Sequence, residues 1–288
     1  MISWVSGSPW EGQLIYLQQE REQNFPKLDS ELEPSKELES LVGLGTVKRE
    51  LKEICAYASI CHKRKTLGLK TEDLCLNMVF IGNPGTGKTT VARIVGKLLK
   101  YYGVLPKGQL VEVERADLVG EFVGHTAKKT KAVINQALGG VLFIDEAYSL
   151  ARGGDKDFGR EALDTLVKAM EDHRHELIVI AAGYPKEMSA FLKLNPGLVS
   201  RMPIVIDFPD YSELELLEIA LLFVAQRDYR LSPKAVEKLK KRLRDLKGNG
   251  RDVRNVLERA MRQQALRLEG LDRIKRDDLM VIISEDIP

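Results

Sequence analysis

The stretch that decides the fold is Leu76-Asn-Met-Val-Phe-Ile81 followed by Gly82-Asn-Pro-Gly-Thr-Gly-Lys-Thr-Thr90. Its first part is a mostly apolar run that predicts a buried strand, and a helical pattern begins at Thr89. The glycine-rich segment between them fits G-x-x-x-x-G-K-[ST], in which backbone N–H groups converge on an anion because glycine has no obstructing Cβ. The helix that follows points the positive end of its dipole at the same place. The stretch therefore predicts a phosphate-binding loop between a strand and a helix.

Two side chains of this loop carry the chemistry of phosphate binding. Lys88 can reach the β- and γ-phosphates of a nucleotide, and the hydroxyl of Thr89 can bind Mg²⁺. A chance glycine-rich turn is the alternative, but it would require neither the strand before the loop nor the helix after it. We expect ATP with Mg²⁺, bound by Asn83, Pro84, Gly85, Thr86, Gly87, Lys88, Thr89 and Thr90.

A second apolar run ends in two acidic residues and reads Val141-Leu-Phe-Ile-Asp-Glu146. Asp145 at the end of this strand can hold the Mg²⁺ shell together with Thr89. Glu146 is suited to orient and deprotonate a water for attack on the γ-phosphate. An acidic pair at an ordinary strand end is the alternative, which the upstream phosphate loop makes weaker. A nucleotide switch would need only the aspartate, so the pair favours hydrolysis, with Glu146 and Lys88 as catalytic residues.

The composition predicts a globular protein. The chain has 288 residues, of which 44% are hydrophobic and 30% charged, and its formal net charge is +2. Disorder needs low hydrophobicity with high net charge, and neither holds here. The longest strongly apolar run, 219–225, is far shorter than the roughly 18 residues of a membrane span. No secretory signal is visible, and Cys55, Cys61 and Cys75 show no paired metal spacing, so we expect a cytoplasmic protein without a membrane partner.

Short apolar runs alternate with helical patterns over residues 39–208. The runs are rich in β-branched or aromatic residues and span 76–81, 109–113, 141–144, 177–182 and 204–208. Such continuous apolar runs suit parallel strands that are covered on both faces. We therefore predict an α/β fold in which a five-stranded parallel sheet lies between two layers of helices.

The pattern changes after residue 208, where strand signals give way to helical spacing. The helical segments are 212–226, 232–246, 252–268 and 275–283, with Ser212 and Ser232 placed as N-caps. We therefore predict three parts: an N-terminal extension over 1–38 that is partly helical near residues 12–23, an α/β nucleotide-binding domain over 39–208, and a small all-α domain over 209–288.

Three longer strings carry a resemblance to a known family. They read Asp117-Leu-Val-Gly-Glu-Phe-Val-Gly-His-Thr-Ala127, Phe143-Ile-Asp-Glu-Ala-Tyr-Ser-Leu150 and Asn195-Pro-Gly-Leu-Val-Ser-Arg201. With the phosphate loop, they make residues 39–285 resemble the AAA+ ATPases, and within them the branch of stage V sporulation protein K and the red-type Rubisco activases. The resemblance implies an αβα core with a helical lid, ATP hydrolysis, a link to sporulation, and assembly of identical subunits into a hexameric ring.

The resemblance also assigns roles to residues outside the two motifs. Gly43 and Leu44 look like part of the segment that lines the adenine pocket, and a plain helix N-terminal turn is an equal alternative. Arg201 looks like an arginine finger, whose guanidinium is offered to the γ-phosphate held by the neighbouring subunit. A surface ion pair is the alternative for Arg201.

Two positions leave alternatives open. Arg251 looks like the sensor arginine of the lid helix, with Arg254 as its rival and a solvated basic face as the alternative for both. Many AAA+ proteins end the fourth strand with Thr-Asn, whereas this chain has Ala181-Ala-Gly-Tyr184. The hydroxyl of Tyr184 could donate in place of the usual amide, or the ring could simply pack.

The loop after the second predicted strand indicates what kind of partner the ATPase acts on. Phe122, Val123 and Gly124 occupy the place where threading members of the family carry a pore loop, and an aromatic ring there can grip an extended peptide. A buried phenylalanine is the alternative. We rank remodelling of a protein client, whose identity is unknown, above a nucleic-acid motor, because residues 209–288 hold 17 Lys plus Arg against 15 Asp plus Glu. A nucleotide-gated scaffold with little turnover is the third possibility.

Overall fold

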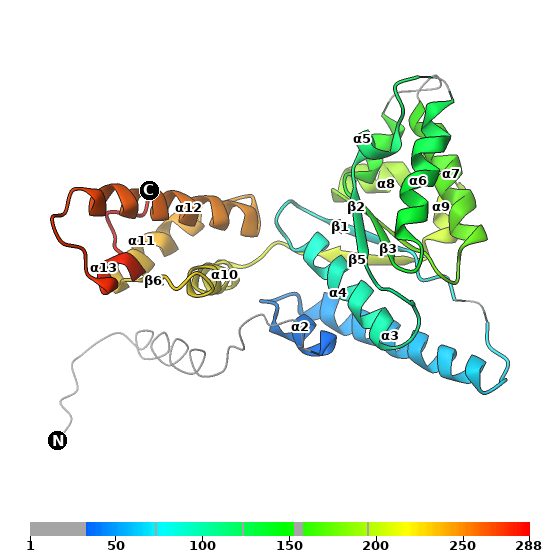
Figure 1. The fold of residues 1–288 in the computed structure, drawn as a ribbon, viewed down its shortest axis with the longest axis horizontal. Helices are drawn as coiled ribbons and strands as arrows, with labels where there is room; N and C mark the ends of the chain where they lie inside the picture. The colour runs from blue at the N-terminus through cyan, green and yellow to red at the C-terminus, as the bar shows by residue number, and fades with distance from the viewer. Residues whose placement is uncertain (1–32, 73, 123, 153–157, 195) are drawn as a thin grey trace. The chain divides into compact units, whose positions relative to one another are not determined.

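The computed structural model describes residues 33–72, 74–122, 124–152, 158–194 and 196–288 (Figure 1). The helix predicted near residues 12–23 lies outside the described residues, and so does Val123 of the predicted pore loop. No helix in the described part of the chain is long and apolar enough to cross a membrane.

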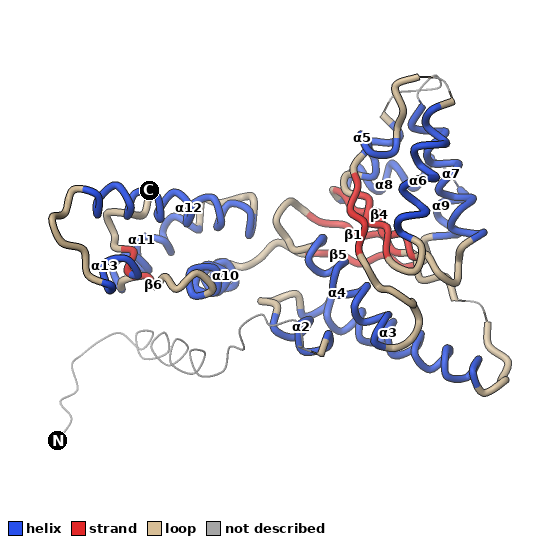
Figure 2. The backbone as a smooth tube through the Cα atoms, viewed as in Figure 1, coloured by secondary structure: helices blue, strands red, loops and turns tan. Residues whose placement is uncertain are grey.

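A five-stranded parallel sheet forms the centre of the α/β part, as predicted. Its strands are β1 (Met78–Gly82), β2 (Leu110–Val113), β3 (Val141–Ile144), β4 (Ile178–Gly183) and β5 (Ile204–Phe208). They lie in the order β2-β3-β4-β1-β5. The strands are drawn in red in Figure 2. Because the strands are parallel, the carboxyl ends of β1 and β3, where the two motifs begin, meet the same edge of the sheet.

Helices cover both faces of the sheet because the strands bury side chains on both sides. Met78 and Phe80 of β1 face one layer and Val79 faces the other, and all three are fully buried. The first layer contains α2 (Pro34–Ser40), α3 (Gly45–Thr66) and α4 (Lys88–Tyr101). The second contains α6 (His125–Ala137), α7 (Phe158–Asp172), α8 (Pro185–Leu194) and α9 (Pro196–Arg201). Two short elements, α5 (Arg115–Leu118) and the 3₁₀ helix η1 (Ala147–Ala151), follow β2 and β3.

The C-terminal part is helical, as predicted, apart from one short pair of strands. Its helices are α10 (Glu213–Ala225), α11 (Pro233–Leu243), α12 (Asn249–Glu269) and α13 (Arg276–Met280). Ser212 and Ser232 cap α10 and α11, because each hydroxyl accepts a hydrogen bond from the backbone N–H three residues later. The sequence analysis did not predict β6 (Arg230–Leu231) and β7 (Val281–Ile282), which form a parallel pair of two residues each.

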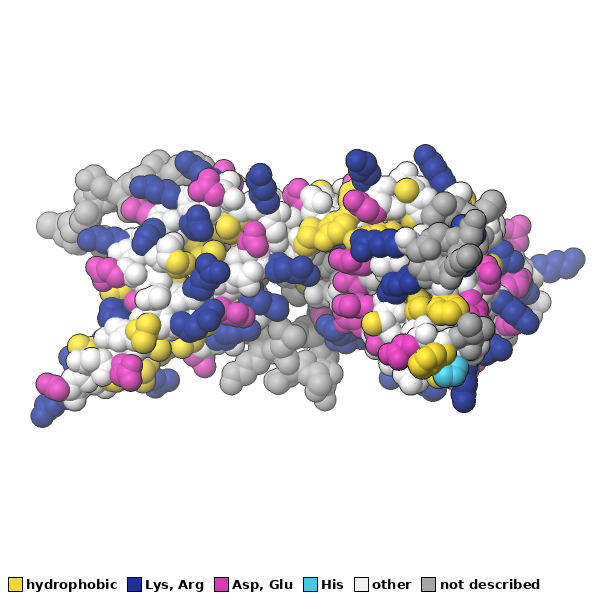
Figure 3. Space-filling model, turned by 90° about the horizontal axis from the view of Figure 1, so that it is seen from above, with side chains coloured by type: hydrophobic (Ala, Val, Ile, Leu, Met, Phe, Trp, Pro, Cys, Tyr) yellow, Lys and Arg dark blue, Asp and Glu magenta, His cyan; other side chains and the backbone are white. Residues whose placement is uncertain are grey.

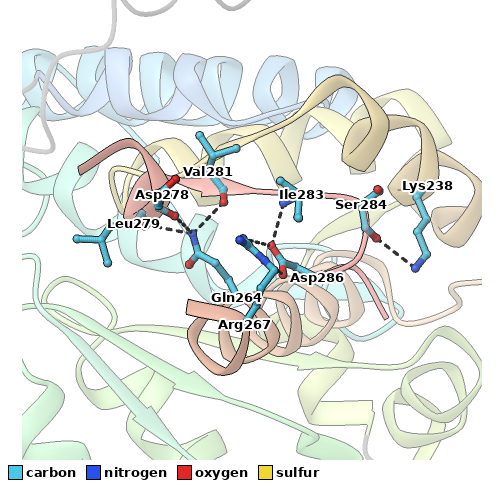
Figure 4. Close-up of polar contacts among 9 residues, drawn as sticks. All are labelled: Lys238, Gln264, Arg267, Asp278, Leu279, Val281, Ile283, Ser284 and Asp286. Carbon is cyan, nitrogen blue, oxygen red and sulfur yellow. Dashed lines mark hydrogen bonds and ion pairs between the residues drawn. The ribbon is translucent and has the colours of Figure 1, made fainter. Parts of the chain in front are cut away.

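Two polar side chains of α12 hold the last segment of the chain in place (Figure 4). The amide of Gln264, which is 3% exposed, donates to the carbonyls of Asp278, Leu279 and Val281. One turn later, Arg267 donates two hydrogen bonds of 2.9 Å to the carboxylate of Asp286. The hydrogen bonds of Gln264 satisfy carbonyls at the end of α13, which have no helical partner. Together with the Arg267–Asp286 pair, they fix the short strand β7 against α12.

Candidate nucleotide-binding site

The phosphate loop connects β1 to α4 in the predicted way. Gly85 and Gly87 have φ angles of 74° and 95°, a left-handed conformation that glycine adopts without steric cost. Gly87 is the N-cap of α4 and has no side chain to occupy the first N–H groups of the helix. The loop therefore presents the start of α4, with Lys88, Thr89 and Thr90, toward an anion.

The ammonium group of Lys88 lies over the loop itself. Its Nζ donates to the carbonyl of Gly82 at 2.9 Å and to that of Asn83 at 2.8 Å. Burial lowers the pKa of Lys88, and the nearby carboxylate of Asp145 partly offsets this effect. The lysine and the aspartate of the two motifs are therefore close enough to interact.

The acidic pair follows the end of β3. Glu146 has a φ of 45°, which is rare for a residue with a side chain, and its N–H donates to Asp145 Oδ1 at 2.9 Å. Its carbonyl accepts from the N–H of Ser149 at 2.7 Å, which fixes the turn into η1. Burial, followed by the charge and hydrogen bond of the Glu146 carboxylate, raises the pKa of Tyr148. Strained positions of this kind are common at functional sites.

A cleft of about 670 Å³ adjoins the acidic pair, a volume in the range of small-ligand sites. Asp145, Glu146 and Arg251 line it, which brings three predicted site residues together. Its other lining residues are Glu114, Arg115, Ala116, Val119, Glu121, Lys129 and Ser149. The sequence analysis did not predict these residues as part of the site. The position of Glu114, directly after β2 and beside β3, could have indicated a place near the acidic pair.

A network of hydrogen bonds joins the phosphate loop to the start of α12. Asn249 is 4% exposed, and its Nδ2 donates to Asp210 Oδ1 at 2.8 Å while its Oδ1 accepts from Tyr211 N–H at 2.9 Å. Asn83 of the loop donates to the same Asp210 carboxylate at 3.0 Å. The N–H of Gly250 donates to the carbonyl of Gly85 at 3.1 Å. Sequence reasoning missed Asp210, Tyr211 and Asn249, since nothing in their local pattern marks them.

The segment before α3 forms the helix N-terminal turn that was one of its two alternatives. Gly43 and Leu44 have φ angles of 60° and 55°, and Leu44 is the N-cap of α3. A Cβ at Gly43 would collide with the carboxylate of Glu215 in α10, so this turn lies against the first lid helix. The turn thus begins a helix and also lies beside α10, and its adenine-lining role stays a prediction.

The structure separates the two candidate sensor arginines. Arg251 lines the cleft, whereas the guanidinium carbon of Arg254 lies 5.9 Å from the centre of the Phe223 ring. Tyr184 is half-buried, and its ring centre lies 5.8 Å from that of Tyr148. Its ring therefore packs, which is one of the two alternatives given for this residue. Arg251 is therefore the better placed of the two arginines.

Arg201 lies apart from the residues that line the cleft. It is the last residue of α9, and its guanidinium contacts the carbonyl of Gly197 at 3.3 Å and the carboxylate of Glu171 at 3.4 Å. Its Nε–H is buried and makes no hydrogen bond to any described residue. The ion pair given as the alternative for Arg201 is present, and Nε is the atom that makes it, 3.4 Å from Glu171 Oε2, although this contact does not meet hydrogen-bond geometry.

Phe122 is 64% exposed, so the interpretation of this residue as a buried core phenylalanine is wrong. Its ring contacts that of His125 edge-on, with 5.5 Å between the ring centres. Gly124, the last residue of the predicted pore loop, is also exposed and is the N-cap of α6.

Comparisons with known proteins agree with this arrangement. Residues 78–210 match the model of the ATPase family associated with various cellular activities (AAA), and residues 212–288 match that of an AAA lid domain. The chain is 56% identical to stage V sporulation protein K of Bacillus subtilis (strain 168), over 88% of this chain and 82% of that protein. It is 43% identical to a chloroplastic ribulose bisphosphate carboxylase/oxygenase activase of Cyanidioschyzon merolae, over 86% of this chain and 87% of that protein.

Among solved structures, the FIGL-1 AAA domain matches with a TM-score of 0.62 at 20% identity, over 86% of this chain and 80% of that one. At this identity the match supports the fold alone. The two family models go further, because their matches span the phosphate loop, the acidic pair and the lid. The similarity to stage V sporulation protein K agrees, because it covers 88% of this chain. The chain therefore belongs to the AAA family of ATPases, and it is an ATP hydrolase similar to stage V sporulation protein K and to Rubisco activases.

Proposed function

We propose that this ATPase works in the cytoplasm as a hexameric ring that hydrolyses MgATP between neighbouring subunits and uses the energy to remodel a protein client. The observation that carries the proposal is the separation of Arg201 from the cleft of its own chain. Its guanidinium has only long contacts among the described residues, from Nε to the Glu171 carboxylate at 3.4 Å and from Nη1 to the Gly197 carbonyl at 3.3 Å, and a phosphate presented from outside the chain could replace them.

The residues of the two motifs and the two arginines then each have a task in the reaction. Lys88 leaves the carbonyls of its own loop to bind the β- and γ-phosphates, and Arg251 binds the phosphates from the side of the lid. Thr89 and Asp145 would hold Mg²⁺, which neutralises charge on the phosphates when it is bound. Glu146 takes the proton from the attacking water, and the neighbour's Arg201 stabilises the charge that develops on the γ-phosphate.

The three-part division of the chain, with its lid over 209–288, fits this function. The lid contacts the phosphate loop through Asn249 and Gly250 and the adenine-side turn through Glu215. Binding or release of nucleotide at these contacts would move the lid, and through it the next subunit. The exposed Phe122 supports a protein client, because a ring that faces solvent is free to grip an extended peptide.

A nucleic-acid motor is the weaker candidate. Lysines and arginines are interspersed with acidic side chains over the face shown in Figure 3. In the basic segment of α11, Lys238 is already engaged, since its Nζ donates to the carbonyls of Ser284 and Ile287. DNA-binding proteins usually present a continuous basic face.

The Phe122→Ala variant tests the client part of the proposal. Because Phe122 lies on an exposed loop, we expect an unchanged melting temperature and a basal ATPase rate within about two- to three-fold of wild type. Stimulation of the ATPase by an unfolded model protein should be lost, since the variant lacks a contact worth about 1–3 kcal/mol in each subunit. Leu69→Ala, which truncates another exposed apolar side chain, is the matched control and should keep the stimulation.

Three other outcomes would contradict the proposal. Full stimulation of Phe122→Ala by the model protein would remove the peptide-gripping role. Stimulation of the wild type by single-stranded DNA and not by protein would favour the nucleic-acid motor. ATP-dependent assembly with negligible turnover in every condition would favour a nucleotide-gated scaffold.

A further inference from the structure

Asn77, the residue immediately before β1, is buried although its side chain is polar. It is 4% exposed, and it lies where β1 and β4 begin to pair at Met78 and Ile180. A buried amide is costly unless its donor and acceptor are both satisfied. The partners of this side chain therefore indicate what it is for.

The amide of Asn77 connects two segments that are far apart in the sequence. Its Oδ1 accepts from the N–H of Val179 in β4 at 2.8 Å, and its Nδ2 donates to the carbonyl of Arg201 at 2.9 Å. The first bond extends the β1–β4 pairing by one residue through a side chain. The second satisfies a carbonyl that the end of α9 leaves without a helical partner.

The two ends of Arg201 are held differently. Its carbonyl accepts from Asn77 and also from the thiol of Cys75 at 3.0 Å. Its guanidinium lies 3.3–3.4 Å from the Gly197 carbonyl and the Glu171 carboxylate. The main chain of the arginine is therefore anchored to the sheet, while its side chain keeps weaker contacts that a phosphate could replace.

We infer that Asn77 is a positioning residue for the arginine finger: it fixes the main chain of Arg201 to β4, so that the guanidinium reaches the γ-phosphate bound by the next subunit. This inference rests on the proposed role of Arg201. Asn77 lies before β1 whereas the phosphate loop follows it, so Asn77 acts through the place it gives to the backbone of α9. Its effect must then appear in the neighbour's active site.

The Asn77→Asp variant replaces only the donor, because one carboxylate oxygen still accepts from Val179 while the other faces the Arg201 carbonyl. We expect ATP binding within about two- to three-fold of wild type, because the phosphate loop is untouched. We expect kcat to fall by about 10- to 100-fold, the loss that follows when a reacting group is misplaced by up to an ångström. Cys75→Ala, which removes the weaker donor to the same carbonyl, should stay within about three-fold of wild type.

Mixed rings identify the site at which the defect acts. Asn77→Asp subunits have an intact phosphate loop, and Lys88→Ala subunits have an intact finger, so mixing the two should raise the rate above the sum of the separate proteins. A gain with Arg201→Ala plus Lys88→Ala, but none with Asn77→Asp plus Lys88→Ala, would overturn the role of Asn77 and leave the proposed function standing. No gain in either mixture, with mixed rings confirmed, would overturn both.

The Asn77→Asp variant buries a carboxylate, which can destabilise the fold. If Asn77→Asp lowers the melting temperature, Asn77→Ala is measured in the same mixtures, because it removes the donor without adding a charge. A folded Asn77→Ala protein with normal ATP affinity, reduced kcat and rescue by Lys88→Ala supports the inference. Unfolding of both variants would show that Asn77 serves the fold alone, and would overturn it.

Discussion

At the scale of single residues, both the backbone and the side chain of Glu146 are constrained. Its backbone is held in a left-handed conformation by the hydrogen bonds of Asp145 and Ser149. The hydroxyl of Tyr148, a residue that is 6% exposed, interacts with its carboxylate. This arrangement aims the carboxylate of Glu146 while its side chain remains exposed to the cleft. We infer from it that Glu146 acts on water and not as a structural group.

The Glu146→Gln variant tests that role. It should bind ATP as the wild type does, because Lys88, Thr89 and the loop amides are unchanged. Its turnover should fall by about 10²-fold or more, because glutamine cannot accept the proton of the attacking water. ATP binding is measured by calorimetry and turnover by phosphate release.

Two results would contradict the role of Glu146 as the base. Turnover of Glu146→Gln within a few-fold of wild type would show that Glu146 is not the base. Loss of ATP binding in the same variant would instead place Glu146 among the groups that hold the nucleotide.

Residue types and their spacing were enough to predict the two motifs, since a strand, a glycine-rich loop and a helix start are local features. Asn249, Asp210 and Asn77 were not predictable in the same way. Each makes hydrogen bonds to residues far away in the sequence, and only the folded chain brings those partners together. A buried asparagine has no local pattern that separates it from an exposed one.

At the scale of elements, α12 organises the lid. Gln264 satisfies three carbonyls of the segment that follows α12, and Arg267 pairs with Asp286, which is 1% exposed. Helical spacing predicted α12 correctly. The short strands β6 and β7 escaped prediction because two-residue strands show no alternation, and their pairing depends on the contacts of Gln264 with distant carbonyls.

The Gln264→Ala variant should destabilise the lid by about 2–3 kcal/mol, because it leaves buried carbonyls without a donor. Thermal unfolding should begin several degrees earlier, and amide hydrogen exchange should increase over residues 278–283. Gln263→Ala is the matched control, since Gln263 is the adjacent, exposed residue of the same helix. Equal stability of the two variants would contradict the account of how the lid is held.

At the scale of the whole molecule, the two halves of the proposed active site lie on different parts of one chain. The cleft holds Asp145, Glu146 and Arg251, while Arg201 ends α9 and lies outside that cleft. One isolated chain would therefore hold an incomplete site. The family resemblance made Arg201 a candidate from the sequence, but only the structure shows that its Nε lies 3.4 Å from the Glu171 carboxylate, away from the cleft.

The most direct test of this shared site is the ATPase rate of mixtures of Arg201→Ala and Lys88→Ala subunits across all ratios. Each variant alone should lose turnover by about 10³-fold, at the low end for arginine fingers, and Arg201→Ala should keep its affinity for ATP. In mixed rings some interfaces pair an intact loop with an intact finger, so the rate should rise to a maximum near equal amounts. A rate that stays at the level of the separate variants at every ratio, in rings shown to contain both, would contradict a site completed by the neighbouring subunit.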